Sequence, residues 1–446
     1  MISGHTRRAF LEAAAGVAAP YVRGQARSAK PNVLFILADD LGYGDLGCYG
    51  QKMIRTPVLD AFCRDSLKFT DAYAGSTVCA PSRCALMTGL HTGHAYIRGN
   101  LRPEPSLRPQ DTTIAEIFKK AGYTTGMFGK WGLGLAETTG IPNKKGFDHW
   151  FGYLDQVHAH NYWTDILWDN QEEFPIQQNF GGKKQVYSQQ LFTEHALDFI
   201  QRYRQQPFFL FLPYTTPHGM FDPPSDAPYS GEKWPQQMKN LAAMITSLDR
   251  DIGKVLAAVK DAGLEENTLV IFTSDNGAVP QAARFFRSNG PFRGAKRDLY
   301  EGGFREPFLA RWPGKIRPGV SSQVFAFWDM LPTFAELTGI APPRHLDGIS
   351  MLPALLGKPQ KNHDYLYWEF YERGYQQALR MGDWKGVRLT QGKPIELYNL
   401  REDPGEEHDL AGGNSAVVAR IEKIMAAEHS PSDFWPPKPG QQSSEG

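Results

Sequence analysis

Short stretches of mostly apolar residues recur along this chain. They span residues 32–38, 123–128, 207–212 and 268–273, and each is followed within a few positions by polar or charged residues. A continuous apolar run is typical of a strand that is buried on both faces, as the strands of a parallel sheet are. The pattern therefore predicts four buried strands with polar residues at their carboxyl ends.

Two segments between these strands carry the spacing of helices. From Leu241 to Val259, apolar residues recur every three or four positions, and Gly263 is a natural end for that helix. Residues 111–121 read as a second helix with an N-cap at its start, which Gly122 would close. Strands alternating with helices predict the α/β class, with a large, mostly parallel sheet flanked by helices.

The last quarter of the chain has a different pattern. Residues 365–400 read as short strands of mixed polarity separated by turn residues, and a helix is expected near 416–428. We therefore expect a large α/β domain over 30–355 and a smaller C-terminal α+β domain with an antiparallel sheet over 356–446. Its Pro-, Gly- and Ser-rich tail is expected to be disordered.

The first 29 residues read as a targeting segment. Arg7 and Arg8 precede Phe10 and a weakly apolar, Ala-rich run, which resembles a twin-arginine export signal with cleavage near Ala29. The alternative is a disordered basic tail. We expect an exported protein of the bacterial periplasm or exterior, and the Ala-rich run is too short to span a bilayer stably.

Composition narrows the possible partners. The 48 Lys and Arg residues balance the 48 Asp and Glu residues, so the chain has no net charge that would favour nucleic acid or a membrane surface. Four cysteines are too few for a disulfide scaffold, and no paired Cys and His pattern predicts a zinc site.

The polar groups at the strand ends suggest a shared site. In open α/β sheets, ligands bind outside the carboxyl ends of the strands, so we expect these groups to converge. Adjacent acids after a buried strand suit a hard divalent cation such as Ca²⁺, although a solvated turn is the alternative for an Asp pair alone. The groups are Asp39, Asp40, Lys130, His218, Asp275 and Asn276.

Residues 79–89 carry the most specific motif. Cys79, Pro81 and Arg83 are spaced Cys-x-Pro-x-Arg, and Pro81 and Gly89 would begin and close a short helix. Cys79 would then lie at the helix N-terminus, where backbone N–H groups favour negative charge. This stretch resembles the signature of the type I sulfatases, in which the cysteine is oxidised to formylglycine. For a lone cysteine, a buried structural thiol would be the better interpretation.

The resemblance implies a fold, a reaction and a set of roles. It implies an alkaline-phosphatase-like sheet, Ca²⁺, a formylglycine-generating maturation enzyme, and hydrolysis of sulfate esters, here of a sulfated sugar or glycan. The implied catalytic residues are Cys79, Arg83, Lys130, His218 and Lys296. The implied metal ligands are Asp39, Asp40, the residue at 79, Asp275 and Asn276.

One position departs from the family pattern. Where the family has Gly-Lys-Trp-His-Leu-Gly, this chain has Gly132 in place of the histidine that serves as a base. Residues 146–162 look like a strand-poor loop over the site, and they include His158 and His160. An extended backbone would point both histidines the same way. We expect one of them to replace the missing base or to bind the substrate sugar.

Two other functions remain open at this stage. A phosphate or phosphonate ester hydrolase would share the sheet and the metal site. A catalytically silent protein that binds sulfated glycans would carry an unconverted Cys79.

Overall fold

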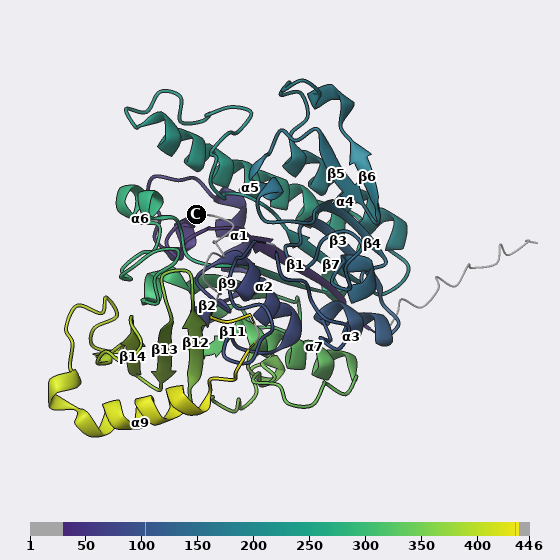
Figure 1. Cartoon of the computed structure of the whole chain (residues 1–446). Coiled ribbons are helices and arrows are strands. Elements are labelled where there is room, and N and C mark those ends of the chain that lie inside the picture. The colour runs from purple at the N-terminus through teal and green to yellow at the C-terminus, as the bar shows by residue number, and fades with distance from the viewer. Residues whose placement is uncertain (1–29, 103, 433, 437–446) are drawn as a thin grey trace, which may run out of the picture.

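A computed structural model describes residues 30–102, 104–432 and 434–436, and its centre is an 11-stranded sheet (Figure 1). The strand order is β10-β2-β9-β8-β1-β7-β3-β4-β5-β6, with β11 paired to β2. The neighbours from β8 through β4 are parallel, and β9, β5 and β6 add antiparallel pairs on either side. The large, mostly parallel sheet is confirmed. Its strands are β1 (Asn32–Ala38), β2 (Leu67–Tyr73), β3 (Thr124–Lys130), β4 (His149–Tyr153), β5 (Ile166–Asp169), β6 (Glu172–Pro175), β7 (Phe208–Pro213), β8 (Thr268–Ser274), β9 (Arg305–Arg311), β10 (Gly319–Ser321) and β11 (Phe325–Ala326).

Helices cover both faces of this sheet, which explains the unbroken apolar strands. In β1, Val33 and Phe35 belong to one apolar core, whereas Leu34 and Ile36 belong to the other. Burying a Leu, Ile or Phe side chain contributes about 1.5–3 kcal/mol, so a strand with two covered faces is apolar at every position. One core includes α2 (Cys79–Thr88), α3 (Ile114–Lys120) and α7 (Met330–Thr338). The other includes α1 (Pro57–Arg64), α4 (Ser188–Tyr203), α5 (Gln236–Asp261) and α6 (Pro280–Phe286).

Three local expectations need correction. The helix expected over 111–121 begins only at Ile114, because Thr113 caps it and forms a reciprocal capping box with Glu116. Helix α5 begins earlier than its apolar pattern, directly after Pro235. The region 146–162 is not a strand-poor loop, because it contains β4, a parallel neighbour of β3.

A second, smaller sheet follows the large sheet along the chain. Its four antiparallel strands are β12 (Leu366–Phe370), β13 (Gln376–Met381), β14 (Trp384–Arg388) and β15 (Glu396–Asn399), and they come after the short α8 (Leu352–Leu355). Helix α9 (Ser415–Ala427) lies beside this sheet and buries Ile421 and Met425 against it (Figure 1). Part of the expected disordered tail is ordered, because Trp435 is buried beside Leu101. Residues 437–446 lie outside the described residues.

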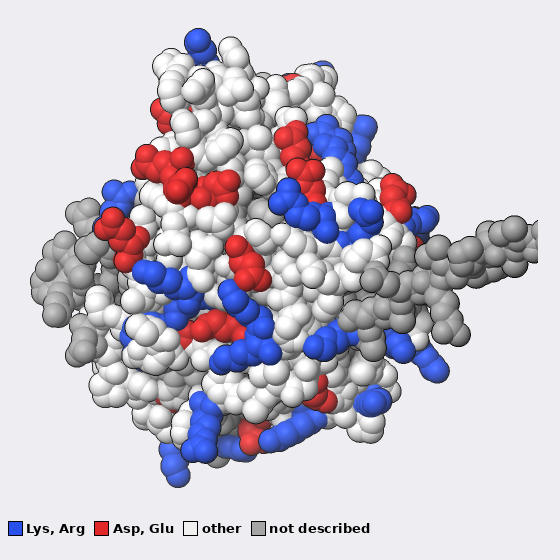
Figure 2. Space-filling view, turned by 90° about the vertical axis from the view of Figure 1, so that its right-hand side faces the viewer, with Lys and Arg blue, Asp and Glu red and all other residues white. Residues whose placement is uncertain are grey.

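The surface mixes charges of both signs. On the face in Figure 2, Lys and Arg side chains are interspersed with Asp and Glu side chains. Within the described residues, no helix is long and apolar enough to cross a membrane, and all four cysteines are free thiols. The expected export signal at residues 1–29 lies outside the described residues.

Candidate active site

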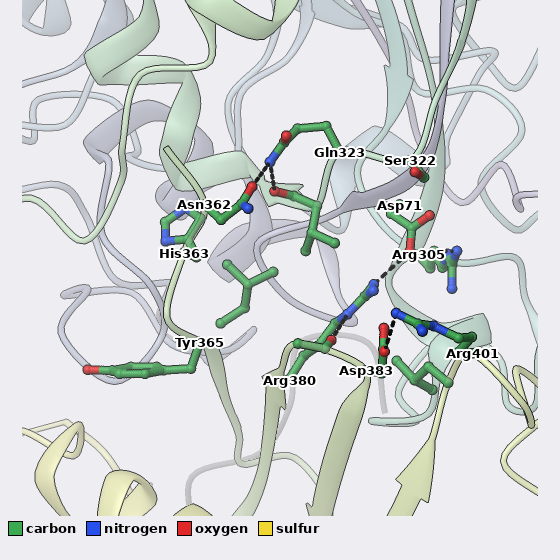
Figure 3. Close-up of a pocket in the computed structure, with 14 residues that line it drawn as sticks. Asp71, Arg305, Ser322, Gln323, Asn362, His363, Tyr365, Arg380, Asp383 and Arg401 are labelled. Carbon is green, nitrogen blue, oxygen red and sulfur yellow. Dashed lines mark hydrogen bonds and ion pairs between the residues drawn. The ribbon is translucent and has the colours of Figure 1, made fainter. Parts of the chain in front are cut away.

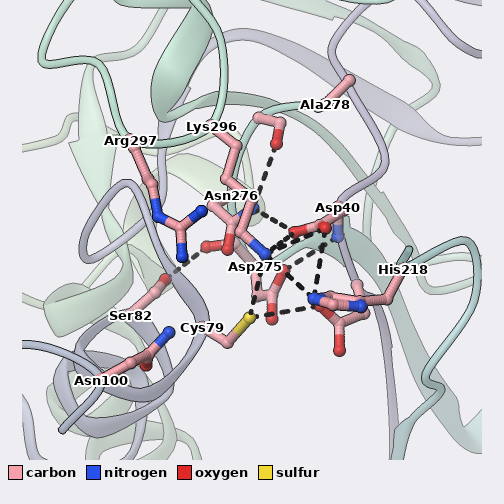
Figure 4. A network of polar contacts seen from close by, with 12 residues as sticks. Asp40, Cys79, Ser82, Asn100, His218, Asp275, Asn276, Ala278, Lys296 and Arg297 are labelled. Atoms are coloured by element: carbon pink, nitrogen blue, oxygen red, sulfur yellow. Dashed lines mark hydrogen bonds and ion pairs between the residues drawn. The ribbon is translucent and has the colours of Figure 1, made fainter. Parts of the chain in front are cut away.

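The expected polar groups meet at one edge of the large sheet. Strands β8, β1, β7 and β3 are consecutive neighbours in it. Asp39 follows β1, His218 follows β7, and Asp275 follows β8, while Lys130 is the last residue of β3. All of these side chains are buried, at 6% exposure or less. Figure 4 shows His218 and Asp275 near Cys79.

Cys79 is the first residue of α2 and faces this cluster. Its Sγ lies 3.4 Å from Asp39 Oδ1 and 3.8 Å from Lys296 Nζ, and the residue is fully buried. Gly89 ends the helix in the left-handed conformation, as expected, with φ 73°. The backbone N–H of Ala80 donates to Asn100 Oδ1 at 3.1 Å, so a side chain from the next loop holds the first turn. No sequence motif pointed to Asn100.

Two cations hold Asp39 ionised. Lys130 Nζ lies 2.8 Å and an Arg83 nitrogen 3.2 Å from Asp39 Oδ2. Burial alone would raise the pKa of Asp39, but these charges, with those of His218 and Lys296, hold that pKa below its ordinary value. The same guanidinium reaches Asp275 Oδ2 at 2.8 Å, so Arg83 bridges the two carboxylates.

The site nevertheless has acceptor capacity that its own hydrogen bonds do not use. Burial and the neighbouring Asp39 raise the pKa of Asp275 to about 6, despite its contact with Arg83. Among the described residues, Asn276 Oδ1 is a buried acceptor without a hydrogen-bond partner. Asn276 Nδ2 donates to Asp40 Oδ1 at 2.7 Å, so this oxygen belongs to the same cluster. Such a set of oxygens suits a hard divalent cation.

Lys296 connects the acidic side of the site to His218. Its Nζ lies 3.0 Å from Asp40 Oδ2 and 3.0 Å from His218 Nε2. His218 Nε2 is also 3.5 Å from Asp40 Oδ2. Lys296 sits on the loop before β9, and the next residue, Arg297, pairs with Glu372 after β12 at 2.9 Å. The small sheet therefore anchors the loop that carries Lys296.

His158 and His160 have different neighbours in the structure. They lie on a single 3-10 turn, η3 (His158–His160), so the expectation of an extended backbone is wrong. The ring of His160 stacks on that of His218, with centroids 4.1 Å apart. His158 instead contacts Thr164 Oγ1 at 2.7 Å. Only His160 of the two is thus in contact with a predicted catalytic side chain.

The space beside Gly132 is filled by another residue. A Cβ on Gly132 would lie 1.9 Å from Gln156 Nε2, and Gly132 has a φ of 74°. Gln156 is 1% exposed and donates to Gly132 O at 3.3 Å, while its Oε1 has no hydrogen-bond partner among the described residues. A histidine at this position would be strained by the left-handed backbone, and its side chain would clash with Gln156.

Comparisons with known proteins decide the family. A family model described as Sulfatase matches residues 31–340. The chain belongs to the sulfatase family. A second model, described as N-sulphoglucosamine sulphohydrolase, C-terminal, matches residues 292–429 of this sulfatase and so includes its small sheet.

Individual relatives match this sulfatase along most of its length. Human N-acetylgalactosamine-6-sulfatase is 35% identical, over 89% of this chain and 84% of its own length. Human arylsulfatase A is 33% identical, over 94% of this chain and 89% of its own length. The solved structure of Ps i-CgsB with k-i-k-neocarrahexaose is 30% identical, has a TM-score of 0.81, and is matched over 90% of this chain and 94% of its own.

A large cavity elsewhere in the sulfatase shares no residue with this site. It has a volume of about 660 Å³ and lies between the two sheets (Figure 3). Its arginines are already paired: Arg305 and Arg380 contact Asp71 at 2.8 Å, and Arg401 contacts Asp383.

Proposed function

We propose that this sulfatase removes sulfate from a carbohydrate, using Cys79 after its oxidation to formylglycine and a bound Ca²⁺. The observation that carries the proposal is the setting of Cys79. Its Sγ lies between an acceptor on Asp39 and the ammonium of Lys296, at 3.4 and 3.8 Å. A reactive group built on this residue would stand between the proposed metal ligands and a proton donor.

The donor set supports a hard cation. The proposed ligands are Asp39, Asp40, Asp275, Asn276 and the residue at 79. The unpartnered Asn276 Oδ1 and the raised pKa of Asp275 both fit a buried set of oxygen ligands for such a cation. When present, Ca²⁺ and the hydrated aldehyde supply a Lewis acid and a nucleophile.

The chain's own cations have separate tasks in this proposal. Arg83 and Lys130 hold the acids in place and add positive charge, which stabilises negative charge developing on sulfate oxygens. The Lys296 ammonium donates to His218 Nε2 at 3.0 Å. In this proposal, that pair passes a proton to the leaving sugar oxygen. His160, stacked on His218, is the proposed substitute for the base missing at Gly132 or a contact for the sugar.

The printed names of the relatives support a sulfated glycan as substrate. One is an N-acetylgalactosamine-6-sulfatase, and a solved relative holds a neocarrahexaose. The deciding experiment is a sulfate-release screen over sulfated mono- and oligosaccharides with protein made in a maturation-competent host. Peptide mass spectrometry should show the aldehyde at position 79, and Cys79→Ala should release no sulfate. Activity in protein that carries only the unmodified thiol would contradict the proposal.

Paired substrates separate the alternatives. A sulfatase should turn over an aryl sulfate much faster than the matching aryl phosphonate, and the reverse order would identify a phosphonate ester hydrolase. Binding of sulfated glycans without sulfate release, by fully matured protein, would indicate a binding protein.

Maturation and export form the last part of the proposal. Because the side chain of Cys79 is fully buried, we expect the maturation enzyme to act before the fold closes. Export of the folded protein to the periplasm or exterior would follow the twin-arginine route. Replacing Arg7 and Arg8 by lysine should leave the precursor in the cytoplasm, and unchanged export would argue against this route.

A further inference from the structure

The side chain of Asn100 lies at the start of α2, next to Cys79, and is 1% exposed. Its Oδ1 accepts the backbone N–H of Ala80 at 3.1 Å, which fixes the orientation of the amide. Its Nδ2 is buried and has no hydrogen-bond partner among the described residues. We propose that Asn100 Nδ2 donates a hydrogen bond to an oxygen of the substrate's sulfate group. This inference rests on the proposed hydrolysis of a sulfate ester at residue 79.

The first turn of α2 has little else to offer an anion. The N–H of Ala80 is taken by Asn100, Pro81 has no N–H, and the N–H of Ser82 reaches Val78 O at 3.3 Å. A helix N-terminus favours negative charge through donors of this kind. Asn100 accepts the Ala80 N–H at one end of its amide and presents an N–H at the other. Hydrogen bonds in such a chain polarise one another, so the outer donor is strengthened.

The loop that carries Asn100 is held from two sides. The backbone N–H of Asn100 donates to Glu372 Oε1 at 3.2 Å, and Glu372 comes from the segment after β12. A Cβ on Gly99 would lie 2.8 Å from the ring of Trp435, so the two pack closely. In Figure 4 the amide nitrogen of Asn100 is turned to the side on which Cys79 lies. A donor that is fixed in advance needs no rearrangement to meet an incoming oxygen, which makes such a group effective in catalysis.

Two other partners for this nitrogen have to be distinguished from sulfate. Buried amide nitrogens are normally hydrogen-bonded, so an ordered water is one candidate. A hydroxyl of the hydrated aldehyde at residue 79 is the other. A contact with sulfate changes the affinity for the anion, whereas a contact with water or with residue 79 leaves that affinity as it is.

Asn100→Asp tests the donor, because the carboxylate keeps the shape of the side chain and an acceptor for the Ala80 N–H. In matured protein with Ca²⁺, kcat/KM for para-nitrophenyl sulfate should fall by about 10²–10³-fold, as for other positioned donors. Inhibition by inorganic sulfate should weaken by about 10-fold or more, since hydrogen bonds to charged groups are strong. Asn100→Leu, which is uncharged, should lose in the same direction, and this excludes charge repulsion as the cause. Asn414→Asp, the same change at the start of α9, should leave both values unchanged.

Binding to an inactive chain separates this contact from the chemistry. Cys79→Ser, made without a maturation enzyme, should bind inorganic sulfate in calorimetry, and the added change Asn100→Asp should weaken that binding by about 10-fold or more. Lower turnover with unchanged sulfate affinity would overturn the proposal and assign the donor to residue 79. If sulfate binds through Asn100 but no ester is hydrolysed, the proposed function fails while this inference is supported.

A crystal structure of the wild-type protein with inorganic sulfate tests the contact without any variant that could fold poorly. A sulfate oxygen should lie about 2.7–3.2 Å from Asn100 Nδ2. A water at that place, with sulfate bound elsewhere, would overturn the proposal. So would wild-type kcat/KM and wild-type inhibition by sulfate in Asn100→Asp.

Discussion

The side chain of Gln156 occupies the space into which a side chain at Gly132 would project. The predicted Cβ position at 132 lies 1.9 Å from Gln156 Nε2. The cause is the pairing of β3 with β4, which continues past both strands: Gly132 N donates to Leu154 O at 2.9 Å. The loop that leaves β4 therefore runs beside residue 132.

This packing predicts strong coupling between the two positions. Gly132→His should destabilise the fold, because the left-handed conformation alone costs about 1–2 kcal/mol for a residue with a Cβ and the imidazole would also meet Gln156. The double variant Gly132→His, Gln156→Ala should recover part of that loss. Urea unfolding of the wild type, both single variants and the double variant measures the coupling. Strictly additive effects would show that the two side chains do not compete for space.

His160 should matter more to turnover than His158. A positioned base contributes about 10²–10⁴-fold to rate, so His160→Ala should lower kcat by an amount in that range if it is the base. If it binds sugar instead, KM should rise on glycans and small aryl sulfates should be little affected. His160→Phe keeps a ring against His218 and tests stacking alone. If His158→Ala and His160→Ala both show wild-type kcat and KM on a glycan substrate, neither histidine is the base or a sugar contact.

Asp275→Asn should weaken metal binding. The change removes one negative ligand and leaves Arg83, 2.8 Å away, with a weaker partner. We expect reduced Ca²⁺ content and a loss of about 100-fold or more in kcat/KM, since a bound metal supplies several kcal/mol of transition-state stabilisation. Asp169→Asn, at an exposed position on β5, is the control. Unchanged calcium content and activity in Asp275→Asn would contradict the ligand assignment.

The buried Asp45 should make stability fall as the pH rises. Burial raises its pKa from 3.8 to about 7, so between these values the unfolded chain loses the proton that the folded chain keeps. The unfolding free energy should therefore drop from about pH 4 to 7. Asp45→Asn keeps an acceptor for Gly42 N and removes the ionisation.

Urea unfolding at several pH values tests this directly. The advantage of Asp45→Asn over the wild type should grow from pH 5 to pH 8, by at most about 3 kcal/mol. Asp169→Asn should show no such trend. An advantage that shrinks with rising pH would mean that the carboxylate, rather than the acid, is the form that the fold stabilises.

The architecture around the strands could be predicted because their patterns are local. The run from Val33 to Ala38 has to be covered on both faces, and polar residues directly after such strands have to meet at one edge of a parallel sheet. The convergence of Asp39, Lys130 and Asp275 follows from those two rules. The helix at Cys79 follows from Pro81, which lies in its first turn, and from Gly89, which ends it in the left-handed conformation.

Other features depend on contacts between distant segments, which no local pattern encodes. Neither Asn100 nor Gln156 belongs to a motif; the first reaches α2 through a loop, and the second reaches Gly132 through the β3–β4 register. His158 and His160 are equivalent as far as the sequence shows. In the structure they lie on one turn of 3-10 helix, and only the ring of His160 stacks on His218.

The sequence by itself thus determined the sheet, the helix that carries Cys79 and the identity of the charged groups, because periodicity and turn chemistry act over a few residues. The tertiary structure alone decided which of those groups touch. It set Lys296 against His218, filled the space at Gly132 with Gln156, and brought Glu428 to His91 across 337 positions of the chain. Such pairings depend on how whole elements pack, and close packing allows only one side chain to occupy each space.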